Sequence, residues 1–511
     1  MRRKFSKLSI FALVIILVLS SVVVCFGADP DGITVQYNGE NVVFEDAKPK
    51  IIDNRTMVPF RQILETMGAE VSYDKAAKTV SAVTDDLEIK FAVGSKDIHV
   101  TKDGVTTIKQ TDVAPLIDKT TNRTYVAARF IAESMGNFVG WDHENKTAII
   151  IDLQQLFAKA DEDFSILSKL MSTNLDLEKA YETTGDFKAD VTFNVPGEPS
   201  ETKNMNLSMN GSMRGIQQKT DVDMVMKLSI DIDPLLANMT PEEKALFDQI
   251  LEMYKDISMK IKMDGESGDM YMNSPMFTIT DPTLTADNWF KMNMYELYDA
   301  MGIDIRPMME MSQSEIKISE LLPLFFVDTG AWNIDTYNNI KISYTLLKNL
   351  LGDEAFNTTM SGTIKTHKLT LSQTQILAAV VKTALSEGIP TDSADLKDIS
   401  AFIEAMDLSG NIVIREKGGV LYDYSLKGSG SYDGHSLNLE LTGNNLNSLI
   451  TMNLIVKDIM EMSIEADSKI TQTTKAPDLT LPEGAKVIDY NEYLSQVMTL
   501  TPMPDAAIPL E

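Results

Sequence analysis

Apolar and polar residues alternate with a period of two over long stretches of the chain after Gly185. Alternation of this kind is typical of antiparallel strands that bury one face and expose the other. The stretches that show it are 205–213, 222–232, 257–263, 412–426, 437–441 and 460–464. The pattern predicts a large antiparallel sheet with one strongly apolar face in residues 185–490, followed by a C-terminal tail at 491–511.

Helical signals interrupt the alternation at three places. A Thr-Pro pair opens residues 240–254, with threonine as the N-cap and proline at the first helical position. Residues 374–387 and 393–406 also have helical spacing, and Ser393 can cap the second of these helices. Long strands with inserted helices predict a half-barrel whose helices lie across its apolar face.

Before this region the apolar spacing changes to three and four residues, which is the period of a helix. The residues that follow this spacing are Leu156, Ala160, Phe164, Leu167 and Leu170. They predict a connecting helix within residues 154–184, and a domain boundary near Asp152.

An internal repeat lies before the boundary. The sequence NRTMV at 54–58 returns as NRTYV at 122–126, and the match continues without a gap at a constant offset of 68 positions. Each copy predicts a short strand, a helix and two further strands, with a glycine that ends the helix. Each helix also places an arginine four residues before a glutamate on its exposed side. The structural positions of the repeat are Arg61, Glu65, Gly68, Arg129, Glu133, Gly136 and Trp141.

The N-R-T-x-V-P-x-R opening, the Met-Gly helix end and the aromatic-Asp turn together resemble the copper amine oxidase N-terminal-like domain, also called the stalk domain. This domain is found in exported proteins of Gram-positive bacteria. The resemblance covers residues 33–153 and implies an α+β accessory module without catalytic residues. The whole chain is therefore expected to be of the α+β class.

The resemblance does not extend to oxidase chemistry. An enzyme of that type needs three histidine copper ligands and a tyrosine in an Asn-Tyr-Asp/Glu setting that becomes the quinone cofactor. The four histidines of this chain are widely separated, and no tyrosine has that setting. We therefore expect no amine oxidase activity, no metal and no cofactor.

The first 28 residues predict a cleaved secretory signal. An apolar run at 8–24 follows a cationic start, and Gly27 and Ala28 close it. The cationic residues are Arg2, Arg3, Lys4 and Lys7. An uncleaved anchor helix is the alternative, whereas lipidation at Cys25 lacks the small residue expected before it. We expect a secreted or surface-associated protein with no membrane-spanning segment in its mature part.

Charge and cysteine content narrow the function classes. The chain has 74 acidic and 46 basic residues, a net charge of -28, which excludes a general nucleic-acid binder because phosphate contacts need clustered Lys and Arg. One cysteine in the whole chain excludes a disulfide scaffold and a thiolate metal cluster. What remains to be inferred about function therefore depends mostly on the alternating pattern of the C-terminal region.

Methionine is unusually frequent, with 30 residues, and much of it lies in the alternating stretches. Its flexible thioether can adapt to varied apolar ligands, but methionine at strand spacing can equally be ordinary core. A third interpretation is that pairs such as Met292-x-Met294 bind a soft metal ion, Cu(I), through their thioether sulfurs. The candidates for lining a ligand site are Met205, Leu207, Met209, Met224, Met226, Leu228, Met259 and Met263.

The predicted half-barrel, together with the closing segment at 477–485, is similar to the LolA-like lipoprotein-carrier architecture. The resemblance implies an exported, non-enzymatic cell-envelope protein that binds a lipid or other apolar ligand. The alternative is a structural or adhesive envelope protein whose half-barrel is filled by its own helices, with an envelope or cell-wall protein as its partner. Dispersed carboxylates would also permit a hydrolase.

Overall fold

A computed structural model describes residues 32–85, 87–102, 104–171, 175–176, 178–195, 203–231, 233, 257–281, 283–300, 305–306, 317–323 and 332–500. Over these residues the chain forms two compact units. The N-terminal unit contains residues 32–165 and 317–349, and the sheet unit contains the described residues of 166–306 and 350–500. The signal expected at 1–28 and the helix expected at 240–254 lie outside the described residues.

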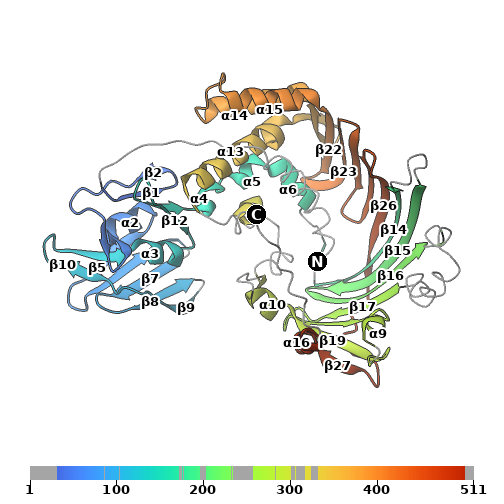
Figure 1. The fold of residues 1–511 in the computed structure, drawn as a ribbon, viewed down its shortest axis with the longest axis horizontal. Helices are drawn as coiled ribbons and strands as arrows, with labels where there is room; N and C mark the ends of the chain where they lie inside the picture. Colours follow the sequence, from blue (N-terminus) through green and yellow to red (C-terminus); the bar gives the residue numbers. More distant parts are fainter. Residues whose placement is uncertain are drawn as a thin grey trace. The chain divides into compact units, whose positions relative to one another are not determined.

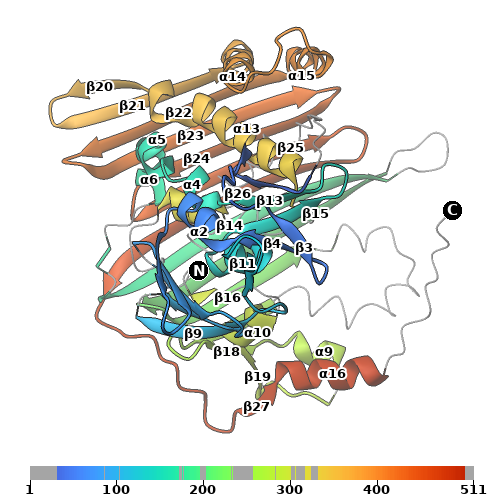
Figure 2. The same ribbon diagram turned by 90° about the vertical axis from the view of Figure 1, so that its left-hand side faces the viewer.

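The N-terminal unit contains three small sheets (Figures 1 and 2). The first has the order β12 (Phe138–Asp142), β13 (Thr147–Ile151), β1 (Thr34–Tyr37), β2 (Glu40–Asn41). The second has the order β10 (Leu116–Asp118), β11 (Arg123–Ala127), β4 (Arg55–Pro59), β3 (Lys50–Ile52). The third has the order β5 (Glu70–Asp74), β6 (Thr79–Val83), β7 (Leu87–Ala92), β8 (Asp97–Lys102), β9 (Val105–Gln110).

The predicted repeat is confirmed by two equivalent units, β4–α2–β5–β6 and β11–α3–β12–β13, in which α2 is Phe60–Thr66 and α3 is Ala128–Ser134. Strands β4 and β11 pair antiparallel about Val58 and Val126, which are equivalent residues of the two copies. The copies are thus related locally by a pseudo-two-fold axis through this pair. Their inward side chains join in one buried core, which includes Ile63 of α2 and Ile131 of α3.

The helix ends and surface pairs of the repeat also agree with the prediction. Gly68 and Gly136 follow the helices with φ of 84° and 81°, a conformation that side chains with a Cβ rarely adopt. An arginine guanidinium lies 3.3 Å from a carboxylate oxygen in Arg61–Glu65, and the distance in Arg129–Glu133 is 3.9 Å. These four side chains are about half exposed, so the pairs contribute little to stability.

The prediction of one continuous connecting helix is wrong. Residues 153–171 form three short helices instead, α4 (Leu153–Leu156), α5 (Ala160–Asp163) and α6 (Ser165–Met171), and strand β14 begins at Ala180. Side-chain hydrogen bonds mark the starts of α4 and α6: Asp152 accepts one from the backbone N–H of Gln155, and Asp353, far along the sequence, accepts one from that of Ile166. The apolar spacing was nevertheless partly informative, because Ala160, Phe164 and Leu167 are buried, whereas Leu156 and Leu170 are only partly buried.

A segment from far along the sequence completes the N-terminal unit. It contains α12 (Ile318–Leu321) and α13 (Ile334–Leu351). Asp163 at the end of α5 accepts a hydrogen bond from the hydroxyl of Tyr344 at 2.7 Å and pairs with Lys348 at 2.8 Å. At the start of α13, the indole of Trp332 stacks on Phe138 of β12 with ring centroids 4.1 Å apart. Sequence spacing gave no sign of this excursion.

The sheet unit is built on one curved sheet of 14 strands (Figures 1 and 2). Its order is β20 (Asn357–Ser361), β21 (Ile364–Ser372), β22 (Asp407–Lys417), β23 (Val420–Tyr432), β24 (His435–Gly443), β25 (Asn447–Val456), β26 (Met460–Thr473), β14 (Ala180–Val195), β15 (Lys203–Gln218), β16 (Asp221–Asp231), β17 (Ile257–Met263), β18 (Asp269–Asn273), β19 (Asn288–Asn293), β27 (Lys486–Asp489). Neighbouring strands are antiparallel except β19 and β27, which are parallel. The predicted α+β class and large antiparallel sheet are confirmed.

Short and long helices accompany this sheet. The short ones are α9 (Phe277–Thr280), α10 (Met294–Ala300) and the 3-10 turn η2 (Asp353–Ala355). The two predicted helices after residue 370 are present as α14 (Gln373–Ser386) and α15 (Ala394–Ala405), and Ser393 caps α15 as expected. Residues 491–500, expected to belong to a tail, form most of α16 (Tyr490–Leu500), whose two tyrosine rings pack on Phe290 of β19.

The segment 474–485, which we call the strap, links two distant strands of the sheet. It leaves β26 in the middle of the sheet and leads to β27 at the edge beside β19. On the way, the ammonium of Lys262 on β17 donates a hydrogen bond to the backbone carbonyl of Asp478. Lys262 is largely buried and also pairs with Asp223 of β16 at 3.2 Å. The strap therefore passes over the β16–β17 pair.

Replacing the lysine that holds the strap should destabilise the sheet unit. We expect Lys262→Met to lower the free energy of unfolding by about 1 kcal/mol, because the apolar stem is kept while a charge-assisted hydrogen bond is lost. Chemical denaturation of the full chain measures the change. Lys260→Met is the matched control, since Lys260 lies on the same strand face but is exposed. Equal losses in the two variants would contradict a role for the Lys262–Asp478 contact.

Candidate apolar binding face

The register of β15, β16 and β17 brings the predicted methionines together on one face of the sheet. Met213 lies opposite Met226, and Met226 lies opposite Met259 on the next strand. The neighbouring row pairs Leu228 with Ile257. Three consecutive strands therefore present a patch of apolar side chains on the same side of the sheet.

Each predicted ligand-lining residue has a definite place in this arrangement. The residues that share the face are Leu207, Met209, Met224, Met226, Leu228, Met259 and Met263, and Met205 belongs to it by register on β15. Of these, Met263 is buried, whereas the others with a described side chain are only partly buried. Their contact with a ligand stays a prediction.

Two further strands extend the patch with residues that were not predicted as part of it. Met272 of β18 lies opposite Ile261 and Phe290, and Met270 lies between Met263 and Met292. The signal was present in the sequence as the short alternation of residues 270–272. It was missed because the strand has only five residues, too few for a clear period.

The apolar face continues in the other direction across the sheet. One row runs through Met209, Ala189, Ile464, Met452 and Leu439, on five neighbouring strands. Except for Ala189, these side chains are partly exposed. We call the whole surface, from β19 to β24 in the order of the sheet, the apolar face. Its side chains keep more contact with solvent than the core of the N-terminal unit, where Ile63, Ile89 and Ile131 are 0–1% exposed.

A buried ion cluster borders the apolar face at β21 and β22. Glu416 of β22 is 5% exposed and lies 3.1 Å from the ring of His367, 3.1 Å from Lys365 and 3.2 Å from Lys169 of α6. The other ring nitrogen of His367 lies 2.8 Å from the hydroxyl of Thr358 on β20. The ion pair with Lys169 holds α6 on this side of the sheet.

Opposing effects set the pKa of the Glu416 carboxyl. Burial alone would raise this pKa, but hydrogen bonds from His367, Lys365 and Lys169 outweigh burial and lower the pKa to about 2. Glu416 is therefore ionised at neutral pH and neutralised by its cationic neighbours. His367 was too isolated in the sequence to suggest a role, and its partner 49 residues away could be found only through strand register.

Two kinds of feature are absent from the described parts of the chain. Within them, no group of three or more His, Cys, Asp or Glu side chains has the geometry to hold a metal ion. Met292 faces the apolar patch from β19, whereas Met294 begins α10, so the two sulfurs belong to different elements. In the same described residues, no helix is both long and apolar enough to cross a membrane.

Comparison with known proteins identifies one part of the chain. Residues 36–150 match the copper amine oxidase N-terminal domain, which confirms the resemblance predicted for residues 33–153. Only this N-terminal domain of the oxidases is matched, and the match leaves the sheet unit unassigned. No curated protein matches the chain.

Among solved structures, an outer membrane channel from Pseudomonas putida F1 is similar to this chain at 8% sequence identity and a TM-score of 0.14. The alignment covers 58% of this chain and 97% of that channel.

Proposed function

We propose that the protein is an exported, non-enzymatic cell-envelope protein that binds the acyl chains of a lipid on the apolar face of its sheet. The observation that carries this proposal is the alignment of apolar side chains on neighbouring strands, which the strand register produces. Most of these side chains are partly exposed. Monomeric proteins rarely leave large apolar patches open without a binding role.

The chemistry of the patch favours a flexible apolar ligand. Methionine side chains at 213, 224, 226, 259 and 272 have unbranched thioethers that can adjust to ligands of different shape. Each square ångström of apolar surface removed from water contributes about 25 cal/mol before the cost of association. An acyl chain matches this surface because it has no polar group that would need a partner there.

The rest of the chain supports a location outside the cytoplasm. The cationic and apolar pattern of residues 1–28 supports export, and the stalk-type module at 36–150 supports a place in the envelope. The charge of -28 opposes a purely electrostatic attraction to anionic lipid head groups. Selectivity would therefore come from the apolar chains of the lipid.

Fluorescent fatty acid titration and native mass spectrometry of the full chain test the proposal. We expect saturable uptake of the fatty acid, and an added mass that extracts into organic solvent. Met226→Glu should weaken uptake about tenfold or more, because a carboxylate would have to lose its water beneath the acyl chain. Val225→Glu is the matched control, since the adjacent residue points to the opposite face of β16.

Two results would overturn the proposal. A bare native mass with no fatty acid uptake would favour a structural envelope protein. Equal weakening by Met226→Glu and Val225→Glu would show that the lipid does not lie on the apolar face.

A further inference from the structure

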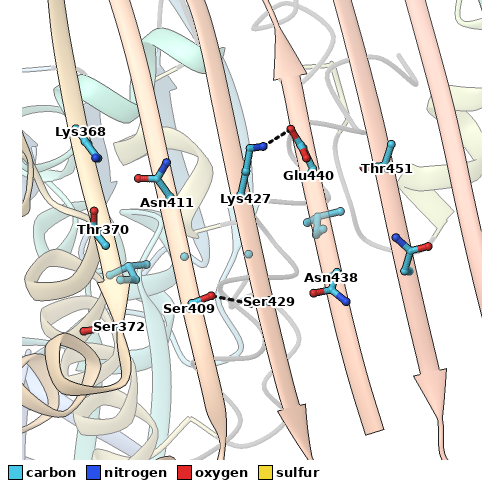
Figure 3. Close-up of a pocket in the computed structure, with 15 residues that line it drawn as sticks. Lys368, Thr370, Ser372, Ser409, Asn411, Lys427, Ser429, Asn438, Glu440 and Thr451 are labelled. Atoms are coloured by element: carbon cyan, nitrogen blue, oxygen red, sulfur yellow. Dashed lines mark hydrogen bonds and ion pairs between the residues drawn. The ribbon is translucent and has the colours of Figure 1, made fainter.

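A second surface with binding chemistry lies on the other side of the sheet, away from the apolar face. There, strands β21 to β25 form an open hollow with a volume of about 590 Å³. This size is within the range of about 300–1,000 Å³ that is common for small-molecule sites. Figure 3 shows the polar side chains of these strands, all on one side of the sheet.

The strand register arranges the hollow as two rows that cross the strands at right angles. The first row contains Thr370, Asn411, Lys427, Glu440 and Thr451, one from each of five neighbouring strands. Because neighbouring strands are about 4.8 Å apart, these side chains repeat at a short and regular spacing. Such a ladder offers one hydrogen-bonding group per strand to a ligand that lies across the sheet.

The second row runs beside the first and is entirely uncharged. It contains Ser372, Ser409, Ser429, Asn438 and Asn453. Only the hydroxyls of Ser409 and Ser429 bond to each other, at 2.6 Å (Figure 3). Amides and hydroxyls both donate and accept hydrogen bonds. The two rows can therefore bind a ligand whose own groups are both donors and acceptors.

Half of these ten side chains are not used inside the described parts of the protein, whereas the hydroxyl of Ser372, for example, caps helix α14. No hydrogen bond within the described residues involves the side chains of Thr370, Asn411, Asn438, Thr451 or Asn453. A buried asparagine of the same unit, Asn273, is by contrast engaged with two backbone carbonyls at 2.8 Å. These five side chains therefore keep their hydrogen-bonding capacity for solvent or a ligand.

The charge of the hollow selects against ionic ligands. Its charged lining residues are Lys368, Lys427 and Glu440, and the last two neutralise each other at 2.7 Å. Neither a cluster of cations for a phosphate nor a cluster of carboxylates for a metal is present among these lining residues. An uncharged ligand rich in hydroxyl groups fits this chemistry best.

We propose that the hollow on β21–β25 binds an uncharged polysaccharide chain that lies across the strands, with successive sugars along the two polar rows. Sugar hydroxyls bond to the amides of Asn411, Asn438 and Asn453 and to the hydroxyls of Thr370 and Thr451. This site is independent of the lipid proposal, because the side chains of the two polar rows point away from the apolar face.

Calorimetric titration of the full chain tests the site with three uncharged hexasaccharides, of β-1,4-linked N-acetylglucosamine, β-1,4-linked glucose and α-1,4-linked glucose. We expect at least one of them to bind. The double variant Asn438→Ala/Asn453→Ala should weaken that binding about tenfold or more, because two hydrogen bonds are lost. Fatty acid uptake should not change in this variant.

The matched control is Asn206→Ala/Asn210→Ala. Both residues are exposed asparagines on the same face of the sheet, on β15 and outside the hollow. Their replacement should leave hexasaccharide binding unchanged. The proposal is overturned if none of the three hexasaccharides binds, or if the two double variants weaken binding equally.

Discussion

Gly140→Ala is expected to lower the free energy of unfolding of the N-terminal unit by about 2–3 kcal/mol. A Cβ on residue 140 of β12 would overlap the backbone carbonyl of Trp332, so either the strand or the segment before α13 must move. Chemical denaturation followed by tryptophan fluorescence measures the loss. Release of Trp332 from its stack on Phe138 should also make its emission more accessible to a soluble quencher.

The control for this substitution is Gly428→Ala, a glycine in a strand where an added Cβ meets no atom within 4 Å. It should leave the stability nearly unchanged. Should Gly140→Ala keep both the wild-type stability and the wild-type quenching, residues 332–349 would not be seated on β12 as described.

Glu416→Gln is expected to lower the free energy of unfolding of the sheet unit by about 2 kcal/mol. The substitution removes the carboxylate that pairs with Lys365 and Lys169 and bonds to the ring of His367, and it leaves the two ammonium groups close together without that carboxylate between them. We place the loss below that of a fully buried pair because the side chain of Lys365 is 45% exposed. Chemical denaturation at neutral pH provides the measurement.

Acid should remove the difference between Glu416→Gln and the wild type. The carboxyl has a pKa of about 2 in the folded protein and an ordinary value of 4.5. A lowered folded pKa means that its contribution is complete above pH 4.5 and is lost as the pH falls towards 2. Glu440→Gln, at an exposed ion pair of the same sheet, should cost no more than about 0.5 kcal/mol. A difference between Glu416→Gln and wild type that stays constant down to pH 2 would contradict this account.

The features that could be predicted from sequence are those determined by local spacing. Period-two alternation located β15, β16 and β17, because a sheet with one buried face must place apolar residues at every second position. The repeat was found for a similar reason, since both copies have an Arg four residues before a Glu and a glycine after the helix. Strand β14 was missed, because Thr183 and Gly185 interrupt its apolar face.

The remaining features depend on residues that meet only through tertiary structure. Trp332 is separated by a long stretch of chain from Phe138, and no periodicity connects the two. The pairing of Glu416 with His367 requires knowledge that β21 and β22 are neighbours and of their register. The polar rows behind the apolar face were likewise invisible, because each strand contributes only one residue to each row.

The order of strands in the sheet has a consequence for the synthesis of the protein. Strands β14–β19 form one continuous meander and β20–β26 form another, and the two meet in the sheet where β14 pairs with β26. The ribosome makes β14 early, so its outer edge has no partner until residues 460–473 have emerged. An unpaired edge of 16 residues is a template for association with other chains. The newly made chain must therefore be kept from aggregation until its last long strand arrives.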